Sequence, residues 1–130
     1  MNIRLAVLAL LAVVLAACSA APAVTVAPTV APNVALRTAP VANAACMDAL
    51  MSGALARHPQ TGLGITSAEG QANAVEWPFG YSARNEGGRI VLVDATSKVV
   101  AREGDKIQVG GGFGNVIWHA CGPVSVAQGS

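Results

Sequence analysis

The sequence predicts a mainly β protein, a small antiparallel barrel or sandwich with one short N-terminal helix. Three observations indicate this fold class. After Gly53 the apolar residues tend to recur at every second position, which is the side-chain period of a β-strand. Turn residues separate these short segments at intervals of about ten residues, as in many all-β folds. Glycine is frequent, as expected where tightly curved strands need room at bends and bulges.

The first residues of the chain predict a signal peptide. A short start with one basic residue, Arg4, precedes a continuous apolar run over residues 5–17. A bilayer span needs about twenty apolar residues, so this run of thirteen is too short to cross a membrane. A basic start, a short apolar run and small residues at its end are typical of secretory signals. We therefore expect residues 1–17 to be removed.

The signal peptide ends in Leu15-Ala16-Ala17-Cys18, which resembles the bacterial lipobox. The resemblance implies a lipoprotein. A diacylglycerol is attached to the thiol of Cys18, the chain is cut before Cys18, and the new N-terminus can carry a further acyl chain such as palmitate. Two or three acyl chains anchor a protein stably, whereas one gives marginal binding. We therefore expect a membrane anchor in the bacterial cell envelope, outside the cytoplasm. An ordinary cleavable signal and an uncleaved anchor are the alternatives.

Residues 18–45 start with this cysteine and continue as a segment rich in Ala, Pro and Val. Ala-Pro pairs recur at 21–22, 27–28, 31–32 and 39–40. Proline fixes φ and pushes the residue before it towards extended conformations, so the segment favours polyproline II and buries no core of its own. We expect a disordered, semi-rigid tether, with a recognition segment for a partner as the alternative.

Charge gives no indication of a polyanionic partner. The chain has eight Lys/Arg and seven Asp/Glu, and removal of residues 1–17 takes away Arg4, which leaves seven of each. A net charge near zero lacks the electrostatic footprint of nucleic-acid binding. We expect no nucleic-acid partner. A small ligand or another envelope protein is the partner class that remains.

The folded domain is expected over residues 46–130. Asn43 can cap a short helix at residues 44–52, which carries Cys46 and ends before Gly53. Seven strands are expected after it, separated by turns that contain Gly, Pro or Asp: 54–58, 62–66, 74–77, 90–94, 98–102, 106–110 and 116–120.

Residues 88–112 are the most informative part of the domain. Their sequence, GRIVLVDATSKVVAREGDKIQVGGG, predicts a meander of three antiparallel strands and a glycine cluster. This pattern resembles OB-like small barrels in uncharacterised secreted bacterial lipoproteins. The phrases GLGI, WPFGYSAR and WHACG are similar to the same kind of protein, and the resemblance covers roughly residues 53–122. It implies a fold and no known activity.

Two cysteines remain once Cys18 is assigned to the lipid, namely Cys46 and Cys121. Disulfides persist outside the cytoplasm, so these two are expected to pair and to join the ends of the folded region. A loop of this length stabilises by about 4 kcal/mol in the chain-entropy model. The alternative is a soft site for copper(I) or zinc, formed by Cys46, His119 and Cys121 with Met47 and Met51 nearby. Oxidation would consume both thiolates, which favours the disulfide.

The glycine-rich segment VGGGFGN, residues 109–115, is a weak binding candidate. A Rossmann match that starts at Gly110 would need glycine at Asn115, and the Gly-Lys-Ser/Thr of a P-loop is absent. We expect a β-bulge or a flexible barrel loop.

A second candidate is an aromatic ligand surface. The segment EWPFGYSAR, residues 76–84, concentrates three of the five aromatic residues. OB-type barrels often bind ligands across one face of the sheet, so this cluster could bind an anionic or sugar-like group. A buried core cluster is the alternative. The expected surface consists of Trp77, Tyr81, Arg84, Trp118 and His119.

Catalysis has little support from the sequence. His58 and His119 lack a nucleophile and an acidic partner by motif. We therefore expect a non-catalytic binding module without a cofactor. The alternatives are the soft-metal protein described above and, with less support, a hydrolytic enzyme.

Overall fold

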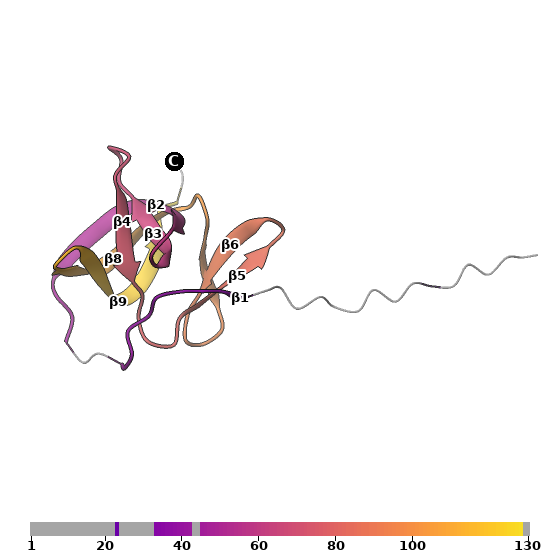
Figure 1. Ribbon diagram of the computed structural model, residues 1–130, viewed down its shortest axis with the longest axis horizontal. Helices are drawn as coiled ribbons and strands as arrows, with labels where there is room; N and C mark the ends of the chain where they lie inside the picture. The colour runs from indigo at the N-terminus through magenta and orange to yellow at the C-terminus, as the bar shows by residue number, and fades with distance from the viewer. Residues whose placement is uncertain (1–22, 24–32, 43–44, 129–130) are drawn as a thin grey trace, which may run out of the picture.

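The computed structural model describes residues 23, 33–42 and 45–128 (Figure 1). Within these residues the chain forms nine strands and no helix, so the predicted mainly β class is confirmed. No helix in this part is long and apolar enough to span a membrane. The expected signal peptide, Cys18 and the tether up to residue 32, apart from Ala23, lie outside the described residues.

Five strands close into a barrel (Figure 1). The strand order around it is β2-β3-β4-β9-β8. Neighbours pair antiparallel except β4 and β9, which are parallel. The long strand β2 closes the barrel, because its C-terminal half pairs with β3 and its N-terminal half pairs with β8. The bounds are β2 Ala49–His58, β3 Gly62–Thr66, β4 Ala72–Glu76, β8 Lys106–Gly114 and β9 Ile117–Val126.

A second sheet stands beside the barrel in Figure 1. Three of its strands, β5, β6 and β7, lie between β4 and β8 in the sequence, and the fourth, β1, precedes β2. The strand order of this sheet is β1-β5-β6-β7, with every neighbouring pair antiparallel. The turn before β8 joins it to the barrel, because Leu55 N–H donates to Asp105 O (2.9 Å) and Gly104 N–H to Leu55 O (2.8 Å). The bounds are β1 Asn33–Val34, β5 Ser82–Glu86, β6 Arg89–Val93 and β7 Val99–Arg102.

One hydrophobic core lies inside the barrel and continues under the second sheet. Alternation along β8 builds part of it, since Ile107 and Val109 are buried whereas Lys106 and Gln108 are exposed. Each fully buried aliphatic side chain stabilises the fold by about 1.5–3 kcal/mol. The other members are Leu55, Leu63, Ile65, Val75, Trp77, Ala83, Ile90, Leu92, Ala101, Trp118 and Ala120.

The helix expected at residues 44–52 is absent from the described part of that range. Residue 44 lies outside the described residues, Asp48 forms a bridge to Gly111, and the last four residues begin β2. Ala, Leu and Met favour helices, but propensity is a weak preference. Here the backbone groups pair with β8 instead, from Ala49 opposite Gly111 to Ala54 opposite Lys106.

Part of the expected tether belongs to the fold. Residues 33–42, which we call the strap, run from β1 to the barrel (Figure 1). Arg37 N–H donates to Thr61 O (3.0 Å), and Ala39 N–H donates to Trp77 O (2.8 Å). Ala39 is buried. The proline-rich composition therefore predicted too long a tether, because an extended segment can also lie along a sheet edge.

Candidate functional site

The predicted disulfide between Cys46 and Cys121 is present. It links the segment after the strap to β9, across 75 residues of sequence and with the two Cα atoms 5.6 Å apart. Cys46 lies on the exposed surface and Cys121 is partly exposed. The bridge therefore fixes Cys46 and its neighbours against β9 on the surface of the barrel.

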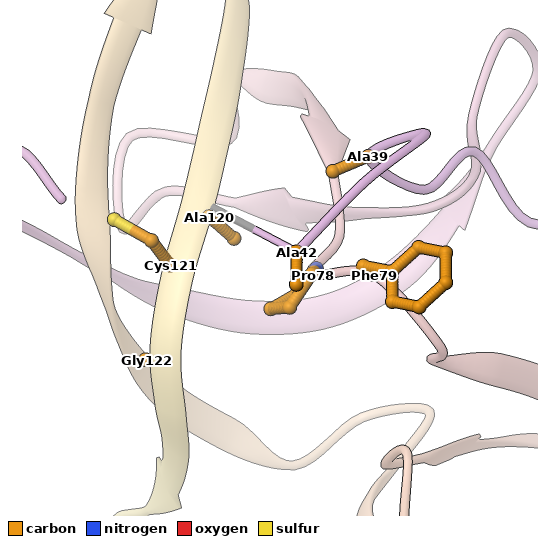
Figure 2. Close-up of a pocket in the computed structure, with 7 residues that line it drawn as sticks. All are labelled: Ala39, Ala42, Pro78, Phe79, Ala120, Cys121 and Gly122. Atoms are coloured by element: carbon orange, nitrogen blue, oxygen red, sulfur yellow. The ribbon is translucent and has the colours of Figure 1, made fainter. Parts of the chain in front are cut away.

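Two shallow cavities flank this bridge. One, of about 170 Å³, is lined by the strap, the loop after Trp77 and β9 (Figure 2). Its lining residues are Ala39, Ala42, Pro78, Phe79, Ala120, Cys121 and Gly122. The other, of about 240 Å³, is lined by Ala45, Met47, His119, Ala120 and Cys121. The side chains that line the first cavity carry no polar group, whereas the second cavity combines an imidazole, a thioether and a disulfide sulfur.

His119 is held by a carboxylate. The parallel register of β4 and β9 places Glu76 opposite His119, and His119 Nδ1 lies 2.9 Å from Glu76 Oε1. Arg37 of the strap joins this pair as a third side chain, because its Nε donates to Glu76 Oε2 (3.2 Å). The side chain of Glu76 is 15% exposed and that of His119 39%. A largely buried carboxylate thus orients an imidazole that solvent can reach.

This arrangement sets the charge of Glu76. Partial burial alone would raise the pKa of the Glu76 carboxyl. The hydrogen bonds and the electrostatic attraction that His119 and Arg37 supply outweigh burial, so the pKa of Glu76 is lowered below its ordinary value of 4.5. The group is therefore ionised at neutral pH and accepts hydrogen bonds from both partners.

The glycine-rich segment lies directly beneath the side chains of Met47 and His119. A Cβ added at Gly112 would lie 2.6 Å from the Met47 Sδ atom, and one added at Gly114 would collide with the His119 imidazole. Gly112 is also the register partner of His119 across β8 and β9. The expected bulge is present, since the register shifts between Val109 and Gly111. The glycines thus make room for Met47 and His119, and they do not form a phosphate loop.

The exposed aromatic surface expected from the sequence does not form. Trp77 and Trp118 are both buried, with 0% and 4% exposure. The Trp77 indole donates to Leu63 O (3.0 Å), which satisfies its polar atom inside the core. Tyr81 packs partly buried against the core, and Arg84 is paired with Glu86 at 2.7 Å on the second sheet. Of the five expected residues, only His119 lines a cavity named above.

The thiolate metal site considered from the sequence is not assembled either. The disulfide occupies the sulfurs of Cys46 and Cys121. In the described ranges, no three His, Cys, Asp or Glu side chains gather closely enough to hold a metal ion. The combination Cys46, His119 and Cys121 therefore offers one imidazole and no thiolate.

Sequence reasoning missed the acidic partner of His119. His58 is elsewhere, at the end of β2, where its Nδ1 accepts a hydrogen bond from Gln60 N–H (3.3 Å). The pairing of His119 with Glu76 follows from the parallel register of two strands far apart in sequence, and no local motif signals such a register. No protein-family model, curated protein or solved structure matches the chain.

Proposed function

We propose that this chain is a lipid-anchored protein of the bacterial cell envelope whose OB-like barrel is a non-catalytic binding module. The disulfide carries this proposal. Among the three cysteines, two are bonded to each other, and the third, Cys18, stands in the lipobox-like sequence. Stable disulfides belong to oxidising compartments outside the cytoplasm, where a lipid-modified Cys18 would hold the barrel.

The topology supports the OB-like part of the proposal. An OB-fold is a five-stranded Greek-key barrel. The barrel here also has five strands, and the order β2-β3-β4-β9-β8 departs from simple up-and-down succession. Strands β5, β6 and β7 of the second sheet take the place of a simple connection between β4 and β8.

The cavity beside His119 supports binding rather than catalysis. Its residues are Ala45, Met47, His119, Ala120 and Cys121, so the lining supplies no hydroxyl or free thiol as a nucleophile next to the imidazole. Its volume of about 240 Å³ is below the roughly 300–1,000 Å³ of pockets for drug-sized ligands. The ligand of this site is therefore an ion or a very small molecule.

Metabolic labelling with a clickable fatty acid tests the anchor. The wild-type chain is expected to take up the label, and Cys18→Ser to lose it, because the hydroxyl of serine cannot form the thioether. Cys46→Ser and Cys121→Ser are matched controls and should keep the label. A Cys18→Ser chain labelled as strongly as the wild type, or an unlabelled wild type, would contradict the proposal.

A further inference from the structure

We propose that the cavity beside His119 binds one soft monovalent metal ion, Cu(I) or Ag(I). The donors are the Nε2 atom of His119 and the thioether sulfur of Met47, and the disulfide between Cys46 and Cys121 stays intact. The inference names the ligand class of the binding module proposed above and rests on that function.

The imidazole is oriented as a metal ligand. Glu76 Oε1 lies 2.9 Å from Nδ1 of His119, and the other oxygen of Glu76 is held by Arg37. When Nδ1 carries the proton and donates it to this carboxylate, Nε2 keeps its lone pair. A carboxylate on the second nitrogen is the usual support of a metal-binding histidine, because it fixes the tautomer and raises the basicity of the donor atom.

The thioether lies over the same face of β8. The Met47 side chain covers Gly112, the register partner of His119, and the imidazole covers Gly114 two residues along the strand. Both side chains line the same cavity. Met47 is 50% exposed, so burial in the core does not account for its position. Gly112 and Gly114 carry no side chain that would separate the two donors.

The donor set selects the class of ion. Thioether sulfur is a soft ligand that favours Cu(I), whereas carboxylate and carbonyl oxygens suit Mg²⁺ and Ca²⁺. Zinc sites usually have four ligands drawn from His, Cys, Asp and Glu. Among the described residues no group of even three such side chains exists, and Glu76 already has two partners. An imidazole and a thioether suit a monovalent ion of low coordination number.

Silver titration followed by NMR tests the site. The full chain, isolated from its host membrane in detergent with ¹³C-labelled methionine methyl groups, is titrated with AgNO₃ in chloride-free buffer. The Met47 methyl and the His119 ring signals should shift together and saturate at one ion per chain. Met47→Leu and His119→Gln should each weaken binding at least tenfold. Glu76→Gln should weaken it by roughly tenfold, as outer-shell changes do.

Met51→Leu and His58→Gln are the matched controls, and both should bind silver like the wild type. Silver binding that survives His119→Gln or Met47→Leu overturns the inference, as does binding that requires prior reduction of the disulfide.

The number of methionine methyl signals distinguishes failure of the metal site from failure of the proposed signal-peptide removal. A chain that shows only the Met47 and Met51 methyl signals and binds no silver contradicts the metal site alone. A third signal, from Met1, contradicts removal of residues 1–17.

Discussion

Glu76 connects three segments that are distant in the sequence. Its carboxylate binds His119 on β9 through one oxygen and Arg37 on the strap through the other. The side chain of Glu76 is only 15% exposed, so water screens these contacts only partly. The ion pairs of this residue should therefore contribute more to stability than an exposed surface pair would.

Replacement of Glu76 should make stability depend on pH in a defined direction. The pKa of Glu76 is lower in the folded chain than its ordinary value of 4.5, so the ionised group stabilises the fold above that value. The contribution is lost as the pH falls through the folded-state pKa. Glu76→Gln should lower the free energy of unfolding by about 1–2 kcal/mol near neutral pH.

Urea unfolding at neutral and acid pH measures this effect. The gap between Glu76→Gln and the wild type should narrow below pH 4.5 and close below the folded-state pKa. Asp48→Asn removes an exposed carboxylate and serves as the control, with little change expected at either pH. A gap that stays as wide below the folded-state pKa as it is near neutral pH, or no gap near neutral pH, would contradict stabilisation of the fold by the ionised Glu76.

At the scale of residues, the sequence predicts those features that depend only on the type and number of the residues. Cys46 and Cys121 could be paired because the lipobox-like sequence sets the third cysteine, Cys18, apart as a proposed lipid site. The positions of Trp77 and Trp118 could not be decided, since a tryptophan beside a proline or in an alternating strand fits a core as well as a surface. The contact of His119 with Glu76 requires the register between β4 and β9, which is a property of the whole barrel.

Among the elements, the strap makes a close backbone contact with Gly62, the first residue of β3. Gly62 has φ +79°, and a Cβ at this position would collide with the carbonyl oxygen of Ala35 in the strap. Gly70, in the turn between β3 and β4, has a similar φ of +83° but nothing within 4 Å of its hypothetical Cβ. A comparison of substitutions at the two glycines therefore separates the cost of backbone strain from the cost of disturbing the strap contact.

Alanine substitution at these two positions should differ in effect. Gly70→Ala should cost about 1 kcal/mol from the left-handed conformation alone. Gly62→Ala carries the same strain together with an overpacking cost of about 1–3 kcal/mol. Parallel urea unfolding curves give both values. Amide exchange at Arg37 and Ala39, whose N–H groups bind the barrel, should accelerate only in Gly62→Ala.

Equal destabilisation by the two substitutions, or unchanged exchange at Arg37 and Ala39 in Gly62→Ala, would contradict the docking of the strap.

The elements that the sequence predicts well are those with an alternating apolar pattern. The strand at residues 62–66 has its predicted bounds, and the other six expected strands each overlap an observed strand. Two strands were missed. Ser82–Glu86 is almost entirely polar and is held by its neighbour β6, and Asn33–Val34 lies in a proline-rich segment. In both cases the partner strand, and not the local sequence, determines the structure.

For the whole molecule, the disulfide constrains the fold itself, and the proposed lipid would attach ahead of the strap. The bridge closes a long loop between residues 46 and 121, worth about 4 kcal/mol in the chain-entropy model. The strap brings residue 33 onto the fold, so residues 19–32 remain as the proposed tether from Cys18. The barrel would then sit closer to the membrane than the composition of residues 18–45 suggests.

The intact mass of the native membrane form, measured before and after reduction, tests this account most directly. We predict a chain that begins at Cys18, carries the mass of a diacylglycerol with or without a further acyl group, and gains two hydrogens on reduction. A chain that still begins at Met1, one that starts elsewhere without a fatty-acid increment, or one whose mass is unchanged by reductant would contradict it.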